Sequence, residues 1–287
     1  TPAEAWVRRE ALAAHPQLAA MVRGNWLTNK SLEPWCRERG GSNLKLALAA
    51  NELIPGDDLG PNHSFKPAFM WDTAMAPFRP LPIAGVLWYQ GESNAESEWR
   101  VTQHDAVLKT LVADWRAQWN RPKLPFLFVQ LPAMKRPHWP AFRASQQRLH
   151  DALSHTGMAV TIDLGHPTDV HPREKQPVGE RLERLAMTQV YGKPHRGSSP
   201  RFETAKQQGH SVMLRLAKGN HQLRTLDGSP PTGFEVKDGR GRWCRAEARI
   251  VAGDTLEVAS PLGQAVTALR YAWRPYPEPK LNLVDKT

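Results

Sequence analysis

The sequence has few cysteines and no long apolar run. Only Cys36 and Cys244 stand among its 287 residues, so one disulfide at most could form, which excludes a disulfide-stabilised scaffold. No stretch approaches the roughly 18 to 20 consecutive apolar residues of a membrane-spanning helix. Apolar residues make up 40% of the chain. This fraction is enough to build a core and excludes a disordered tail.

Positive charge is in excess but is not concentrated. The formal net charge is +10, from 38 Lys and Arg against 28 Asp and Glu, and basic and acidic residues alternate along most of the length. A nucleic-acid-binding protein more often gathers its basic residues on one element. The short groups at residues 135–136 and 240–245 predict solvated surface instead. We therefore expect neither a nucleic-acid nor a membrane partner, and the basic surface is compatible with a weakly acidic polysaccharide.

Short apolar runs alternate with helical patterns between Ile83 and Tyr191. The runs of strand length cover residues 83–88, 125–131 and 158–164, and the helical patterns cover residues 104–119, 142–153 and 178–189. Such an alternation predicts a buried parallel sheet with helices on both faces. In the part of the chain that precedes Ile83, we expect a helix from Ala3 to Met21 and a long loop over residues 40–67.

The hydrophobic period changes to two after about Pro200. Short strands are expected at residues 210–216, 223–226, 233–237, 246–251, 255–259 and 265–273, with turns at Asp-Gly and Gly-Asp pairs. The sequence thus predicts an α/β domain over residues 1–195 and a small antiparallel β-domain over residues 200–287. Residues 193–200 are the expected linker.

Polar segments follow each of the three expected parallel strands, where open α/β sheets place their sites. These segments are Trp88–Asn94, Gln130–Pro132 and Asp163–Pro172. In the third, Asp169 stands two residues before His171, so the carboxylate can orient the imidazole as a general base. Asp169 can equally cap a helix that starts near the end of this segment.

The same segment is dense in potential metal ligands. Asp163, His166, Asp169 and His171 all belong to it. However, the sequence has neither an HExxH motif nor paired cysteines at zinc-site spacing. We expect no metal, and His166 remains a second, weaker candidate for the base.

The segment after the first strand offers amides and a hydroxyl. Gln90 and Asn94 can donate hydrogen bonds to a developing oxyanion, or can satisfy loop backbone groups. Glu92 can fix an arginine, a histidine or a turn. Gly-Glu-Ser-Asn-Ala around Ser93 nearly matches the G-x-S-x-G nucleophile elbow, so an α/β-hydrolase with Ser93 as nucleophile is an alternative. Against it, residues 95–99 predict a loop rather than an immediate helix, and Asp169 and His171 are unusually close for that fold.

Several tryptophans lie outside the predicted helix cores and have two possible roles. Their indoles can stack on sugar rings or fill ordinary core positions. They are Trp6, Trp26, Trp35, Trp71, Trp88, Trp99 and Trp139.

Two motifs together carry a family resemblance. Residues 88–95, Trp-Tyr-Gln-Gly-Glu-Ser-Asn-Ala, and residues 169–182, which begin Asp-Val-His-Pro-Arg-Glu-Lys-Gln, closely resemble the sialate O-acetylesterase family of SGNH-type serine esterases. The first motif is shared with neighbouring acetylxylan-esterase-like families, and the second is long and specific. The resemblance extends over nearly the whole chain, from Thr1 to Trp273.

The resemblance implies an SGNH-like three-layer α/β/α domain, here incomplete, followed by a β-domain. It implies hydrolysis of O-acetyl esters on carbohydrates with no cofactor. His171 matches the catalytic histidine, and Asp169 is the best match for its acid, although the usual SGNH pattern has the acid at the position of Thr168. Gln90 or Asn94 matches the amide of the oxyanion hole, and the substrate is an acetylated sugar, either sialic acid or a plant polysaccharide.

The family's nucleophilic serine lies in a Gly-Gln-Ser-Asn-like motif near the start of its catalytic domain, and we find no such motif here. We therefore expect the nucleophile on an N-terminal segment that is absent from this chain and acts as its partner. A periplasmic or secreted location is likewise implied only by the resemblance. A degenerate esterase that only binds carbohydrate is the non-enzymatic alternative.

Overall fold

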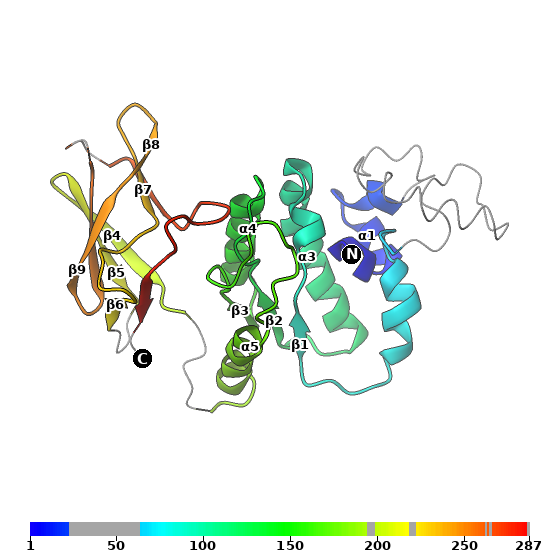
Figure 1. Cartoon of the computed structure of the whole chain (residues 1–287). Helices are drawn as coiled ribbons and strands as arrows, with labels where there is room; N and C mark the ends of the chain where they lie inside the picture. The colour runs from blue at the N-terminus through cyan, green and yellow to red at the C-terminus, as the bar shows by residue number, and fades with distance from the viewer. Residues whose placement is uncertain (23–63, 194–198, 218–221, 262, 264–265, 286–287) are drawn as a thin grey trace.

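The structure is a computed structural model that describes residues 1–22, 64–193, 199–217, 222–261, 263 and 266–285. Helices that flank a parallel sheet form one side of the molecule, and antiparallel strands form the other (Figure 1). Cys36, Trp26, Trp35, most of the expected loop over residues 40–67 and the centre of the expected linker lie outside the described residues.

The expected N-terminal helix is broken into three short pieces. They are the 3-10 turn η1 (Ala3–Trp6), the helix α1 (Arg9–Ala14) and the 3-10 turn η2 (Ala19–Val22). The helix α1 ends because Pro16 disfavours the helical region for His15, whose backbone is extended at φ −89° and ψ 123°. Later in the chain, a π-turn, η3 (Trp71–Met75), and a 3-10 turn, η4 (Ala76–Phe78), precede the first strand.

Three parallel strands form the sheet of the α/β part in the order β1-β2-β3. They are β1 (Val86–Trp88), β2 (Phe126–Val129) and β3 (Thr156–Ala159). The first two match the expected runs, but β3 begins and ends earlier than expected. The ladder stops because the Thr161 hydroxyl donates to the Gln130 carbonyl, so the apolar residues that follow belong to a loop.

Three helices cover the two faces of this sheet, as expected. They are α3 (Glu98–Gln118), α4 (Trp139–Ala152) and α5 (Gln176–Gln189). Ser97 caps α3, because its hydroxyl accepts a hydrogen bond from the Arg100 N–H at 3.3 Å. Phe126 and Phe128 face α3 and α4, whereas Leu127 between them packs on Leu185 of α5. None of the helices within the described ranges is long and apolar enough to cross a bilayer.

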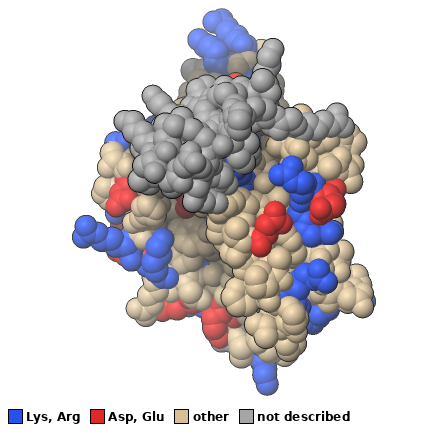
Figure 2. Space-filling model, turned by 90° about the vertical axis from the view of Figure 1, so that its right-hand side faces the viewer, with Lys and Arg blue, Asp and Glu red and all other residues tan. Residues whose placement is uncertain are grey.

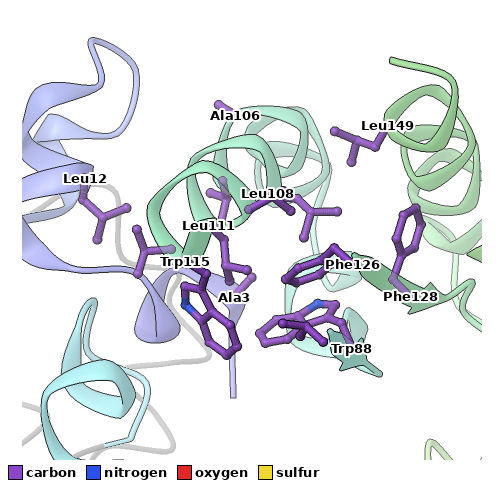
Figure 3. Close-up of a cluster of buried hydrophobic side chains, with 14 of the residues drawn as sticks. Ala3, Leu12, Trp88, Ala106, Leu108, Leu111, Trp115, Phe126, Phe128 and Leu149 are labelled. Atoms are coloured by element: carbon purple, nitrogen blue, oxygen red, sulfur yellow. The ribbon is translucent and has the colours of Figure 1, made fainter. Parts of the chain in front are cut away.

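The main core lies between α3 and the sheet, and aromatic side chains dominate it. Trp88 of β1 meets Trp115 of α3 edge to face, with ring centroids 6.0 Å apart at 85°. Phe126, Leu111 and Ala3 close around them (Figure 3). Burial of each large apolar side chain contributes about 1.5–3 kcal/mol. Of the tryptophans considered for sugar stacking, Trp71, Trp88 and Trp139 are therefore core residues.

Antiparallel strands form the second part. One sheet has the order β4-β5-β10-β9, with β4 (Phe202–Gln208), β5 (Ser211–Leu216), β10 (Thr255–Ala259) and β9 (Glu247–Ala252). A second has the order β11-β7-β8, with β11 (Ala268–Tyr271), β7 (Phe234–Lys237) and β8 (Trp243–Arg245). A third pairs β12 (Leu283–Asp285) with β6 (Leu223–Thr225). The unexpected strand β4 is exposed along most of its length, so it lacks the apolar alternation that marks a strand.

The two parts are joined through a buried arginine. The Arg143 guanidinium on α4 donates to the backbone carbonyls of Ala272, Arg274 and Pro275, at 3.4, 2.6 and 3.3 Å. Burial lowers the pKa of Arg143 to about 10. These bonds hold the loop after β11 against the helix that carries Arg143.

An Asp-Ser-His cluster lies between α3 and α4, with His104 and Ser145 buried and Asp105 partly exposed at its rim. The Ser145 hydroxyl donates to the Asp105 carboxylate, and His104 Nδ1 lies 2.7 Å from the same hydroxyl oxygen. Because the hydroxyl hydrogen is directed to Asp105, His104 Nδ1 is the donor to the Ser145 oxygen. Ser145 is fully buried. This order of contacts, with the serine in the middle, ties two helices together and offers no accessible nucleophile.

The stability of the fold should therefore depend on pH through His104. Burial lowers the pKa of His104 to about 3, whereas an unfolded histidine titrates near 6.5. The unfolded state thus binds the proton first, so the free energy of unfolding should fall by about a few kcal/mol as pH drops from about 6.5 towards 3. Urea unfolding at pH 7.5 and pH 5 measures this slope.

The His104→Gln variant should lose most of that dependence, while His210→Gln at an exposed turn should keep it. In His104→Gln, the free energy of unfolding should still depend weakly on pH, because burial also lowers the pKa of His150. An unchanged slope in His104→Gln would contradict the assignment.

Candidate active site

A cleft of about 970 Å³ runs along β1 and past its carboxyl end. Its polar lining includes three residues that the sequence singled out, Gln90, Glu92 and His171. Its apolar lining comes from β1 and the elements beside it and includes Trp6, Met75, Phe78, Leu87, Trp115 and Trp119. The loop after β1 and the loop that follows β3 therefore meet at one site, as expected for the carboxyl edge of a parallel sheet.

Two glycines allow these loops to approach their neighbours. Gly91 has φ 151°, and a Cβ there would lie 2.5 Å from the Phe142 ring. Gly165 passes so near the loop after β2 that a Cβ would lie 2.0 Å from the Ala133 carbonyl oxygen. The Lys135 N–H also donates to the Pro167 carbonyl at 2.9 Å. The segment that carries His171 is therefore held beside the loop after β2 by close backbone contact.

His171 is presented to solvent at the cleft, next to Asp169. Its side chain is 88% exposed, and its Nδ1 lies 3.9 Å from Asp169 Oδ1, about 1 Å longer than a hydrogen bond. The same carboxylate oxygen accepts the backbone N–H of His171 at 2.8 Å. The expected helix near Pro172 begins instead at Gln176, so Asp169 caps a turn and faces the imidazole.

The other two potential metal ligands have structural partners. Asp163 forms a two-pronged ion pair with Arg181 of α5, with N–O distances of 2.7 and 2.6 Å. His166 Nδ1 accepts the backbone N–H groups of Thr168 and Asp169, at 3.3 and 2.9 Å. Within the described ranges, no three His, Cys, Asp or Glu side chains converge as a metal site would require.

The two candidate amides occupy different places. Asn94 is 2% exposed and does not line the cleft. Its Nδ2 donates to Glu4 at 2.9 Å, and its Oδ1 accepts the Ala3 N–H at 2.8 Å. Gln90 lines the cleft, and its Nε2 donates to Asn94 Oδ1 at 2.7 Å and to the Thr1 carbonyl at 3.1 Å. Asn94 therefore anchors the first turn, and Gln90 is the amide at the cleft.

Ser93 also lines the cleft. It lies in a 3-10 turn, η5 (Glu92–Ala95), whereas the unusual backbone angle of the segment belongs to Gly91. Its hydroxyl accepts a hydrogen bond from the Thr1 nitrogen at 3.4 Å. A nucleophile elbow holds its serine on the strained residue itself, so the local geometry around Ser93 differs from an elbow.

Three charged or phenolic side chains at the cleft were not expected from the sequence. Lys175 Nζ lies 4.6 Å above the Tyr89 ring, and Arg136 pairs with Glu96. Burial, with a smaller contribution from Glu92, raises the pKa of Tyr89 to about 12, so its hydroxyl stays protonated. Tyr89 lies in the motif of residues 88–95, and Lys175 lies in the motif of residues 169–182. Their places in these motifs could have identified them from the sequence.

Comparisons with known proteins relate this chain to carbohydrate acetylesterases. A family model described as "Carbohydrate esterase, sialic acid-specific acetylesterase" matches residues 68–187, which include both motifs. Over this region the chain is similar to the sialic acid-specific acetylesterase family. The human and rat proteins named sialate O-acetylesterase are 28% and 26% identical over 90% and 96% of this chain. The matches cover 52% and 54% of those two proteins, so the chain spans about half the length of these relatives.

A solved structure shows the same fold. The crystal structure of a carbohydrate acetylesterase from Xanthomonas citri has a TM-score of 0.73 and 34% sequence identity, over 79% of this chain and 54% of that one. The prediction of an α/β fold with a parallel sheet, followed by antiparallel strands, is confirmed. The family resemblance inferred from the two motifs is confirmed as well.

Proposed function

We propose that this chain contributes the acid–base half of an active site that hydrolyses O-acetyl esters on carbohydrates. The observation that carries the proposal is the convergence of His171 and Gln90 on one cleft at the carboxyl end of the sheet. The family match supports the ester and the carbohydrate as the chemical classes of bond and substrate. The particular sugar is left open between sialic acid and plant polysaccharides.

In the proposed mechanism, a serine hydroxyl attacks the acetyl carbonyl and His171 removes its proton. The imidazolium then protonates the departing sugar oxygen, which leaves an acetyl-enzyme. Water attacks this ester while His171 again takes the proton, and the imidazolium then returns it to the serine oxygen as acetate is released. Asp169 orients the imidazole and stabilises its charged form. The 3.9 Å separation requires only a small rotation to become a hydrogen bond.

Gln90 is the proposed side-chain donor to the oxyanion. Its Nε2 already points two N–H groups at oxygens, Asn94 Oδ1 and the Thr1 carbonyl. The contact at 3.1 Å is made at the cleft, so a tetrahedral oxyanion could replace the Thr1 carbonyl there. The buried Asn94 holds the Gln90 side chain in place, because Asn94 Oδ1 accepts one of its N–H groups. The two amides that the sequence left as alternatives thus take different roles in this proposal.

The nucleophile is proposed to come from a strand that docks on β1. Among the described strands, only β2 pairs with β1, and Leu87 at its centre is 63% exposed. The faces of a parallel sheet are normally covered by other elements. An open strand edge is normally paired or covered as well. A strand added in parallel to β1 would end beside Gln90 and the His171 loop, where the attacking hydroxyl is needed. Lys175 and Arg136 would then border the substrate.

An activity measurement with serine labelling tests the proposal. We expect the full natural protein to release acetate from acetylated carbohydrates, and this 287-residue chain alone to be at least about a thousandfold less active. A fluorophosphonate probe should label a serine outside this chain. Labelling of Ser93, or of any serine within these 287 residues, together with full activity, would overturn the external nucleophile and favour the Ser93 alternative. A complete absence of hydrolysis in the full protein would favour the carbohydrate-binding alternative.

A further inference from the structure

The outer face of the β11-β7-β8 sheet carries a group of side chains that the proposed hydrolysis does not use. Side chains alternate between the two faces of a strand. Val236 of β7 is buried in the core, so Glu235 and Lys237 on either side of it point to the outer face. The strand register places Arg270 opposite Glu235 and Trp243 opposite Lys237. These four side chains from three strands therefore share one surface.

Arg270 is fixed between two exposed indoles on this surface. Its guanidinium carbon lies 4.1 Å from the ring centroid of Trp243 and 5.6 Å from that of Trp273. Its Nε donates to Glu235 at 2.8 Å. Each tryptophan is 36% exposed. The guanidinium thus holds two aromatic side chains open to solvent at defined positions, which reduces the entropy lost when a ligand binds.

The surface is also strongly positive. Arg245 stands opposite Glu235 on β8, and Lys237 Nζ lies 5.9 Å from the indole beside it. Arg274 follows β11 and approaches Glu235 at 3.7 Å. Together with Arg270, four cations surround a single carboxylate.

We propose that this surface, named here the Trp243 platform (Glu235, Lys237, Trp243, Arg245, Arg270 and Trp273), binds a carbohydrate chain whose sugars carry carboxylates. Indole rings offer apolar faces that suit the C–H faces of sugar rings. Guanidinium and ammonium groups form charge-assisted hydrogen bonds to carboxylates. The Glu235 side chain is only 13% exposed and lies 2.8 Å from Arg270 and 3.7 Å from Arg274, so its role is to hold these two cations in place.

The same cations would suit nucleic acid less well. Proteins that bind duplex DNA by charge commonly neutralise about six to ten phosphates, more than the three cations of the platform and the neighbouring Arg274 provide. Figure 2 views the molecule from the side away from the β part, and on that face too Lys and Arg lie scattered among Asp and Glu rather than in one stripe.

The platform belongs to the β part of the molecule, whose strands β7 and β8 are drawn apart from β1 of the α/β part (Figure 1). It can therefore hold one part of a long glycan independently of the site that would remove acetyl groups. The inference goes beyond the proposed hydrolysis and does not depend on it, because binding can be measured in a chain that releases no acetate.

Calorimetric titration of the 287-residue chain with polygalacturonate tests the proposal. Trp243→Ala and Trp273→Ala should each weaken binding about tenfold, and Arg245→Gln should weaken it and reduce its dependence on salt. Two matched controls should bind as the unaltered chain does. Tyr191→Ala removes an aromatic side chain that is 59% exposed elsewhere, and Arg249→Gln breaks a cross-strand pair with Glu257 in the other sheet.

Three results would overturn the proposal. The first is equal affinity of the platform variants and the control variants. The second is equal affinity for a neutral polysaccharide such as dextran. The third is more effective competition by duplex DNA than by polygalacturonate at the same charge concentration. Unfolding midpoints of all variants show whether each is folded, and Arg245→Gln, at an exposed position, keeps the test valid if a tryptophan variant is not.

Discussion

Replacement of His171 by alanine is expected to lower kcat for acetyl-ester hydrolysis by about 10³-fold or more, with a much smaller change in KM. In the proposed mechanism the imidazole both activates the nucleophile and protonates the leaving sugar oxygen, so both chemical steps lose their proton carrier. Its side chain is 88% exposed, and its removal should leave the fold intact. Acetate release by the full natural protein, with and without the substitution, measures the effect.

Two other histidines serve as controls for this result. His166→Ala removes the imidazole that holds the same loop, and it should reduce activity far less, because its ring accepts backbone N–H groups away from the cleft. His210→Ala, in the β part, should have no effect on activity. If His171→Ala kept near-normal turnover, or if His166→Ala were the more damaging change, the assignment of the general base would be wrong.

Replacement of Glu4 by alanine is expected to lower the free energy of unfolding by about 3–5 kcal/mol, the usual cost of breaking a buried ion pair from one side. Glu4 and Arg100 are 5% and 3% exposed, and Arg100 Nη1 donates to Glu4 Oε1 at 2.8 Å. The other oxygen of Glu4 accepts from Asn94. The substitution thus removes the carboxylate from a buried guanidinium and also frees the amide that fixes Gln90.

Denaturant unfolding of the chain checks this second prediction, with Glu10→Ala as the matched control. Glu10 belongs to the same N-terminal segment, but its side chain is 75% exposed and lies 3.8 Å from Arg8, so its loss should cost less than about 1 kcal/mol. The double variant Glu4→Ala/Arg100→Ala should recover part of the lost stability. If Glu4→Ala lowered the free energy of unfolding no more than Glu10→Ala does, the prediction would be wrong. Water would then already screen the Glu4–Arg100 pair.

The parallel sheet and its helices were predictable because their signals are local. Every side chain of Phe126–Val129 is buried, and a run of apolar residues reports burial on both faces without knowledge of the neighbours. Failures occurred where another contact overrides the pattern. Apolar residues continue past β3, yet the strand ends early, where Thr161 bonds to the Gln130 carbonyl. The N-terminal helix was predicted as one piece although Pro16 stands within it.

The candidate site was only partly predictable. Its two segments could be located because strand ends and motifs are read along the chain. The separation of Gln90 from Asn94 could not, since it depends on Glu4, which lies about 90 positions away in the sequence. Arg136 lies in a loop, as expected, but its pairing with Glu96 could not be predicted, because Glu96 lies on another loop.

By itself, the sequence determined the class of fold, the family and the two segments that carry the candidate chemistry, because apolar periodicity and motif residues are properties of neighbouring positions. Only the tertiary structure decided which amide faces the cleft, that β1 pairs with β2 alone among the described strands, and that two tryptophans flank Arg270 on an outer sheet face. Each of these depends on contacts between residues far apart in the chain, and the register of packed strands and loops fixes them.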